Sequence, residues 1–312
     1  MPDTSRPLYN LGSINIDHVY RVPHLVRPGE TLASTGYQQV LGGKGANQSL
    51  AMALAGGRVE HWGRLGLSDD WAHRQLTDAG VGTAALDLVD EPSGHALIQV
   101  DDKAENAIIL YPGANHGFAD ADIDRRIDNA EPNSWLLLQN ETNGLARAME
   151  QAHAKGLSIA FNPAPMHAAV NELPLSTCQL LFVNRGEAAA LVGLPEGTSA
   201  DALLAALGER LPSIELVLTL GSDGVCYQHG DVRLELPAYR VEARDTTAAG
   251  DTFIGHFLAA RLAGLDVETC LRRASTASAL CVQREGAAPS IPDAHAVDEA
   301  LAEWPALSLK RH

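Results

Sequence analysis

The sequence predicts an α/β fold in which helices cover both faces of a parallel sheet, with a smaller second sheet beside it. In the later part of the chain, short apolar runs alternate with segments of helical periodicity, as they do where helices join parallel strands. Two β-rich stretches nearer the start show no helical periodicity and predict the smaller sheet. With 312 residues, of which 46% are hydrophobic, the chain can bury a sizeable core.

The expected elements follow one another along the chain. An apolar run at 8–14 predicts the first buried strand, and the residues up to about 40, rich in Val, Thr, Tyr and Gly, predict short strands and turns. A helical pattern of small side chains covers 46–55 and ends at two glycines, and a second β-rich stretch covers 95–111. Buried strands are then expected at 135–138, 158–161, 180–183 and 215–218, with helices such as 144–155 and 200–210 between them.

Composition excludes several classes of function. The net charge of −16 and the pI near 5.1 have the wrong sign for nonspecific binding to nucleic acid or to an anionic membrane. No apolar run approaches the roughly 20 residues of a membrane helix, and 1–10 has no signal-peptide core, so a cytoplasmic location is expected. The four cysteines have no C-x-x-C or metal-ligand spacing, which predicts reduced thiols.

The most informative stretch lies near the end of the chain. Ala248, Ala249 and Gly250 precede Asp251, and an amphipathic helical pattern begins at Phe253. Small residues at a helix N-terminus leave backbone N–H groups free to bind an anion such as phosphate. Asp251 would then be a proton acceptor for a hydroxyl that attacks the phosphate. The same residues fit a simple helix cap, and both interpretations remain open from this stretch alone.

Two loops nearer the start offer polar groups. The loop after the first strand carries Asn15 and Asp17, which suit a polyhydroxylated ligand but also an Asx turn. The segment 42–47, Gly-Gly-Lys-Gly-Ala-Asn, opens the first helix and would let backbone N–H groups approach a ligand, although it also fits a tight turn. It is not a Walker A loop, because Lys44 is followed by Gly45 instead of Ser or Thr.

Further polar residues follow the later strands. Glu141, then Asn184 and Glu187, and then the glycine-containing loop 219–224 each come directly after an expected strand. Ligands of open α/β sheets bind at the carboxyl ends of the strands, so this shared position predicts one site. The absence of a G-x-G-x-x-G fingerprint, an H-E-x-x-H pair and a G-x-S-x-G elbow leaves nicotinamide, zinc and serine-hydrolase chemistry without support.

Taken in order, these loops resemble the ribokinase-like (PfkB-type) carbohydrate kinase family over about 12–292. The two specific motifs are 42–47 and 245–253. The resemblance implies an ATP-dependent kinase with a three-layer fold, in which helices flank a mostly parallel central sheet. It also implies that 1–312 is a single kinase domain, that a β-sheet lid is formed from about 15–40 and 95–112, and that two copies pair through the lid as a homodimer.

The resemblance implies a role for each matching residue. It places the sugar at Asn15, Asp17, Gly43, Lys44, Asn47, Glu141 and Asp251. It makes Asp251 the catalytic base, with an anion hole at Gly250, Ala249 and Ala248. It places ATP at Asn184, Thr219, Leu220, Gly221, Ser222, Asp223, Gly224, Gly250, Asp251 and Ser275. It associates Glu187 with Mg²⁺ and phosphate, and it places a monovalent cation, usually K⁺ and often held by backbone carbonyls, among Asp245, Thr247, Cys281, Arg284, Gly286 and Ser290.

The implied reaction is phosphorylation of the O5 hydroxyl of D-ribose to ribose 5-phosphate. The start of the first loop and Glu141 favour ribose, whereas a nucleoside would favour a lid richer in aromatic residues than Tyr20, Tyr37 and Tyr111. A related kinase for deoxyribose, fructose or a nucleoside stays open, as does a non-catalytic sugar or nucleotide sensor. Ser275 is smaller than the usual residue at its position, which leaves adenine contacts there undefined.

Overall fold

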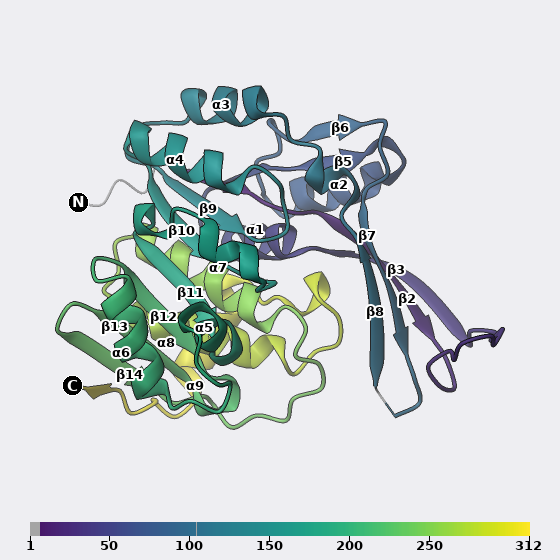
Figure 1. Ribbon diagram of the computed structural model, residues 1–312. Coiled ribbons are helices and arrows are strands. Elements are labelled where there is room, and N and C mark those ends of the chain that lie inside the picture. The colour runs from purple at the N-terminus through teal and green to yellow at the C-terminus, as the bar shows by residue number, and fades with distance from the viewer. Residues whose placement is uncertain (1–6, 104) are drawn as a thin grey trace.

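The computed structural model describes residues 7–103 and 105–312 (Figure 1). Residues 1–6, in the segment where no signal peptide is expected, and Ala104, in the second expected lid segment, lie outside the described residues. The central sheet has the strand order β15-β14-β13-β12-β11-β10-β9-β1-β4. Its strands are β1 (Leu8–Leu11), β4 (Val59–Trp62), β9 (Trp135–Gln139), β10 (Ser158–Asn162), β11 (Leu180–Asn184), β12 (Glu215–Thr219), β13 (Val225–His229), β14 (Val232–Leu236) and β15 (Lys310–Arg311).

The sheet is mostly parallel, as predicted. The neighbouring strands β4, β1, β9, β10, β11 and β12 pair in parallel with one another. The edge of the sheet beyond β12, formed by β13, β14 and β15, is antiparallel. Alternate side chains of one strand point to opposite faces, so Leu136 and Leu138 enter one core and Leu137 enters the other. This alternation of fully buried residues is the reason that both faces need a layer of helices.

Helices cover the two faces as two separate layers (Figure 1). One layer is formed by α3 (Asp120–Asn129), α4 (Leu145–Lys155), α5 (Arg185–Val192) and α6 (Ala200–Arg210). The other layer is formed by α1 (Lys44–Leu54), α2 (Asp70–Asp78), α7 (Ala249–Leu262) and α8 (Val267–Cys281), with α9 (Ala294–Glu303) packed on α8. The four cysteines are free, as the sequence predicted, and all four are buried.

The first strand is shorter than the sequence predicted. It ends at Leu11, three residues before the expected end at Ile14. The backbone of Ile14 bonds to a side chain instead of a neighbouring strand, because its N–H donates to Asn115 Oδ1 (2.9 Å) and its carbonyl accepts from Asn115 Nδ2 (3.1 Å). The expected helix at 46–55 begins two residues earlier, at Lys44, and the strands and helices expected between 135 and 218 are reproduced within one residue. The helix expected from Phe253 begins at Ala249, and it is buried on all sides instead of amphipathic, because every residue from Asp251 to Ala260 is buried.

The two β-rich stretches form one small sheet that projects from the body of the molecule (Figure 1). Its order is β3-β2-β7-β8, and β2 and β7, which come from the two different stretches, pair in parallel. The strands are β2 (Asn15–Arg21), β3 (Gly36–Gly42), β7 (Gly94–Val100) and β8 (Asn106–Tyr111), and a two-stranded ribbon of β5 (Arg64–Gly66) and β6 (Asp87–Val89) lies near their base. We call the four-stranded sheet the lid.

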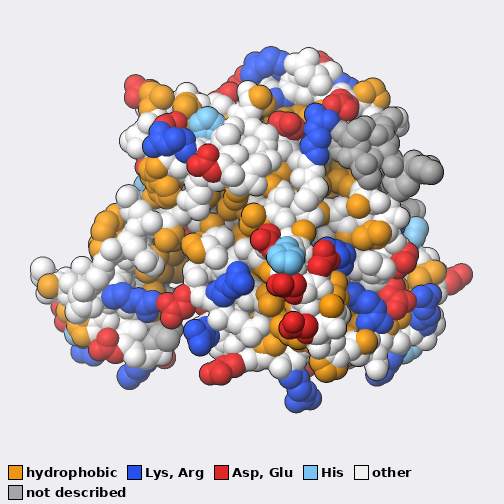
Figure 2. All heavy atoms as spheres, turned by 180° about the vertical axis from the view of Figure 1, so that it is seen from behind, with side chains coloured by type: hydrophobic (Ala, Val, Ile, Leu, Met, Phe, Trp, Pro, Cys, Tyr) orange, Lys and Arg blue, Asp and Glu red, His pale blue; other side chains and the backbone are white. Residues whose placement is uncertain are grey.

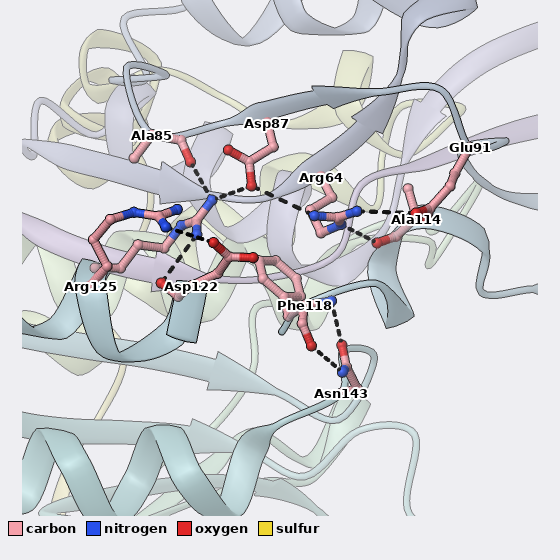
Figure 3. Close-up of polar contacts among 10 residues, drawn as sticks. Arg64, Ala85, Asp87, Glu91, Ala114, Phe118, Asp122, Arg125 and Asn143 are labelled. Carbon is pink, nitrogen blue, oxygen red and sulfur yellow. Dashed lines mark hydrogen bonds and ion pairs between the residues drawn. The ribbon is translucent and has the colours of Figure 1, made fainter. Parts of the chain in front are cut away.

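Two buried arginines join the base of the lid to the body (Figure 3). Arg64 Nε donates to the carbonyl oxygen of Ala114, just after β8, over 3.2 Å. Arg126, on α3, forms an ion pair of 2.5 Å with Asp87. The guanidinium carbons of both arginines lie within 6 Å of the centre of the Phe118 ring, at 5.8 and 5.6 Å. These contacts fix the point at which the lid leaves the body.

The surface carries charged side chains of both signs (Figure 2). On the face shown in Figure 2, acidic and basic side chains are interspersed and form no continuous basic patch. In the part of the chain that the structure describes, none of the helices combines the length and apolarity needed to span a bilayer.

Candidate active site

A cleft of about 1250 Å³ lies between the inner face of the lid and the carboxyl ends of the central strands. A volume of this size can hold two small ligands side by side. The cleft brings together most of the residues predicted from sequence: Asn15, Asp17, Gly43, Lys44, Asn47, Glu141, Asn184, Glu187, Thr219, Gly221, Ser222, Gly224, Asp245, Thr247, Ala248, Ala249, Gly250, Asp251, Ser275 and Gly286.

Five predicted residues are not among those that line the cleft: Leu220, Asp223, Cys281, Arg284 and Ser290. The carboxylate of Asp223 pairs with Arg185 over 3.2 Å. Cys281 Sγ lies 3.0 Å from Ser290 Oγ, and both residues are fully buried. Their side chains are turned into the core, so any contact of these two residues with a cation would have to come from the backbone.

Asp251 lies in the first turn of α7 and does not act as a helix cap. The N-cap residue is Ala248, which has a positive φ of 60° and no capping side chain. The carboxylate of Asp251 instead accepts hydrogen bonds from α1, from Asn47 Nδ2 to Oδ2 (3.1 Å) and from Gln48 Nε2 to Oδ1 (2.8 Å). The Ala249 N–H donates to the Thr246 carbonyl over 3.3 Å, and the next N–H groups of the first turn, those of Gly250 and Asp251, are available to an anion in the cleft.

Close packing of α7 on α1 brings these side chains together. A Cβ atom at Gly255 would lie 2.4 Å from Ala51 Cβ and 2.7 Å from Met52 N, a distance at which neither helix could keep its place. Because Gly255 has no side chain, the two helix backbones approach closely, and Asp251, one turn earlier on α7, reaches α1.

Lys44 is surrounded by acidic groups. Its pKa is raised chiefly by Asp251 and further by Glu141 and Glu187. Burial raises the pKa of Asp251, while Lys44 and the amide groups of Gln48 and Asn47 oppose that shift. Lys44 therefore stays protonated in the cleft and favours the ionised form of Asp251, the form that can accept a proton.

Asp17 and Glu141 face the cleft near the base of the lid. Burial, with a further contribution from Glu141, raises the pKa of Asp17 to about 7. A Cβ atom at Gly42 would lie 2.1 Å from Asp17 Oδ2, so this glycine leaves room for the carboxylate. Glu141 Oε2 accepts from the Lys44 backbone N–H (2.9 Å) and from Ser13 Oγ (2.5 Å), at the N-terminus of α1.

Sequence reasoning missed three residues that hold the predicted ones in place. Ser13 binds Glu141, Gln48 binds Asp251, and Asn115 Nδ2 donates to Asn15 Oδ1 over 2.8 Å. Ser13 and Gln48 adjoin the recognised motifs, so their position could have drawn attention to them. Asn115 is 100 positions away from its partner, and the sequence carries no local signal for that contact.

Asn184 and Glu187 form a capping box at the start of α5. Asn184 Oδ1 accepts from the Glu187 N–H over 2.9 Å, and Glu187 Oε2 accepts from the Asn184 N–H over 2.9 Å. Burial raises the pKa of Glu187. This pair therefore has a structural role in addition to its place in the wall of the cleft.

Asp245 joins two loops beside the start of α7. Its Oδ1 accepts from the N–H (2.9 Å) and hydroxyl (2.6 Å) of Thr247, and its Oδ2 accepts from the Gly286 N–H (2.9 Å). Burial alone would raise the pKa of Asp245, but these hydrogen bonds outweigh it and lower the pKa. Within the described ranges, no three His, Cys, Asp or Glu side chains converge to hold a metal ion, so a cation here would depend on backbone or ligand oxygens.

Comparison with known proteins covers nearly the whole chain. Residues 8–294 match the pfkB family of carbohydrate kinases. The ribokinase of Haemophilus influenzae is 36% identical over 290 residues, which cover 90% of this chain and 94% of that protein. The deoxyribokinase of Salmonella typhi is 30% identical over 301 residues, with 93% and 97% covered. The structure of Arabidopsis thaliana ribokinase complexed with ribose and ATP gives a TM-score of 0.83 at 30% identity, with 95% of this chain and 98% of that chain covered.

Proposed function

The chain belongs to the pfkB family of carbohydrate kinases, phosphotransferases with an alcohol group as acceptor, and we propose that it phosphorylates the O5 hydroxyl of D-ribose with ATP. The observation that carries this proposal is the position of Asp251. Its carboxylate is buried, is held by Asn47 and Gln48, and lines the cleft beside the free N-terminus of α7. A hydroxyl and a phosphate can meet there.

In this mechanism Asp251 accepts the proton of the O5 hydroxyl as O5 forms a bond to the γ-phosphorus. The bond from that phosphorus to the β,γ-bridging oxygen breaks, so the products are ribose 5-phosphate and ADP. Backbone N–H groups from Ala248 to Asp251 stabilise the charge on the phosphoryl oxygens. Lys44, protonated at the same place, adds a positive charge to that region.

The sugar half of the cleft is assigned to Asn15, Asp17, Gly43, Lys44, Asn47 and Glu141. Their carboxylate, amide and ammonium groups suit a ligand made mostly of hydroxyls. Ribose is favoured because the relatives described above include a ribokinase at 36% identity and one complexed with ribose and ATP. Deoxyribose is the second candidate, because a deoxyribokinase is similar over nearly its whole length.

The nucleotide half is assigned to Asn184, Ser275 and the loop 219–224, whose residues Thr219, Gly221, Ser222 and Gly224 line the same cleft. Mg²⁺ would enter with the phosphates of ATP and neutralise part of their charge, with Glu187 as the nearby protein carboxylate. The ionised Asp245 and the adjoining loop carbonyls suit a monovalent cation such as K⁺, which would support the shape of the anion hole.

The lid supports a proposal of a homodimer. Val19 and Ile98 line the cleft, so side chains that alternate with them lie on the outer face of the lid. That face exposes large apolar groups: Tyr37 (54% exposed), Leu97 (40%), Ile109 (66%) and Tyr111 (49%). An apolar patch of this kind marks an interface. We also propose that 1–312 acts as one kinase domain in the cytoplasm.

A coupled assay of ADP release tests the function. Ribose, deoxyribose, fructose and adenosine are supplied with ATP and Mg²⁺, with and without K⁺. The largest kcat/KM is expected with ribose, and activity is expected to rise with K⁺. A larger kcat/KM with deoxyribose would assign the second candidate, and binding of a sugar with no sugar-dependent ADP release would indicate a sensor.

A further inference from the structure

Gln48 lies directly behind the proposed base and is fully buried on α1. Its amide nitrogen donates to Asp251 Oδ1 (2.8 Å) and to Asn162 Oδ1 (3.3 Å), and its amide oxygen accepts from Gln139 Nε2 (2.7 Å). Three partners on three different elements therefore determine which end of the Gln48 amide faces the carboxylate.

The partners of Gln48 belong to a larger network of buried amides. Gln139 Nε2 also donates to Asn10 Oδ1 (3.0 Å), and Asn10 Nδ2 donates to Ser49 Oγ (2.8 Å). Asn10, Gln139 and Asn162 lie at or next to the carboxyl ends of β1, β9 and β10, three adjacent strands of the sheet. The network thus ties the Asp251 side chain to three adjacent strands of the central sheet.

Gln48 cannot act by touching a ligand. It has no exposed surface and is not among the residues that line the cleft, whereas its neighbour Asn47 lines the cleft. Any effect of Gln48 on the reaction must therefore pass through Asp251.

We infer that Gln48 is a positioning residue, which orients the Asp251 carboxylate toward the cleft and favours its ionised form. This inference rests on the proposed role of Asp251 as general base. A hydrogen bond donated to a carboxylate stabilises the charged form, and Asp251 needs that support because it is buried. The other titratable groups that interact with Asp251 are Lys44 on α1, Glu187 on α5 and the Cys281 thiol on α8, and all three are kept in the variants below.

The test is the pH dependence of kcat at saturating sugar in Q48M and Q48E. The profile of kcat reports groups of the enzyme–substrate complex, whereas that of kcat/KM would also report Asp17 of the free enzyme, whose pKa is about 7. Methionine keeps the length of the side chain but removes the donor. Because hydrogen bonds to charged groups are among the strong ones, the acidic limb of the Q48M profile is expected to move to higher pH by about one to two units. Glutamate also places a second carboxylate beside Asp251, so a larger upward shift is expected for Q48E. The KM for the sugar should change less than about twofold, because Gln48 touches no ligand.

The pH at which activity falls on the acidic side of the profile does not depend on the amount of active enzyme. Partial misfolding of a variant therefore does not change the pH that is measured. Q179M is the matched control: Gln179 accepts from the Ile159 N–H and donates to the Thr177 carbonyl next to the amino end of β11, away from the cleft. The acidic limb of its pH profile should lie at the same pH as that of the wild type.

If the acidic limbs of Q48M and Q48E also lie at the wild-type pH while D251N is inactive, the inference about Gln48 is wrong and the proposed function stands. If D251N is active, the proposed base is wrong, and the inference falls with it.

Discussion

Asn47 Nδ2 lies 3.1 Å from Asp251 Oδ2, although 204 positions separate the two residues along the chain. Each belongs to one of the two motifs by which the sequence resembles its family. The contact exists because α7 packs against α1 without a side chain at Gly255. The Asp251 carboxylate thus links the second motif to the first through one hydrogen bond.

Asp251→Asn is expected to lower kcat by about 10²–10⁴, the usual contribution of a general base. Ribose and ATP should still bind, because the amide occupies the same volume and the other residues of the cleft are unchanged. Kinetics and titration calorimetry separate the two effects. Asp78→Asn is the control, since Asp78 is exposed at the end of α2, does not line the cleft and should keep wild-type activity. A loss below about threefold in D251N would contradict the assignment.

Asp17 should make the stability of the protein depend on pH. Its pKa of about 7 lies above the ordinary value of 3.8, so the folded protein binds this proton more tightly than the unfolded chain. The stabilisation is complete below about pH 4 and is lost as the pH rises through 7. The free energy of unfolding should fall by at most about 4 kcal/mol over this window.

Urea unfolding at several pH values measures this effect. Asp17→Asn should be more stable than the wild type at about pH 8, and the difference should shrink as the pH approaches 4, since asparagine does not titrate. The same variant should bind ribose more weakly, because a carboxylate that accepts hydrogen bonds from hydroxyls is lost. A difference in stability that does not vary with pH would show that Asp17 does not titrate in this window.

Arg126, at the base of the lid, should contribute more to the free energy of unfolding than its neighbour Arg125. Arg126→Met removes the hydrogen-bond donor of the Asp87 carboxylate and of the Ala85 carbonyl, and only Arg64, 3.7 Å from Asp87, still pairs with that carboxylate. We expect a loss of about 2–4 kcal/mol in the free energy of unfolding, at the lower end for a buried pair because Asp87 is partly exposed. Arg125→Met is the control, because Arg125 pairs with Asp122 at the surface (Figure 3) and such pairs stabilise little. Equal losses in urea titrations would argue against the buried cluster.

The outer face of the lid should decide the oligomeric state. Ile109→Asp places a charge at the most exposed side chain of the apolar patch and is expected to convert the proposed dimer to a monomer. Sedimentation velocity measures the change. Val232→Asp is the control, since Val232 is 51% exposed on β14 of the central sheet and should leave the assembly intact. A wild-type protein that is already monomeric would contradict the proposal.

Much of the fold could be predicted because local patterns control it. Apolar runs as short as 135–138 and 180–183 favour buried strands over helices because of their length, and the small-sided helix that starts near 46 is marked by its periodicity and its terminal glycines. The edge strands β13 and β14 were not predicted individually. Which of their residues are buried depends on the pairing of β13 with β12 and of β14 with β13. The sequence of either strand alone does not show that pairing.

The sequence by itself determined the family and the chemical groups of the site, because the motifs that carry them are contiguous. Only the tertiary structure decided how those groups are held. Asn115 holds Asn15 and Gln48 holds Asp251 across 100 and 203 positions, and such pairings depend on the packing of the whole chain. The raised pKa values of Asp17 and Asp251 have the same origin, since burial is a property of the folded molecule and not of any segment.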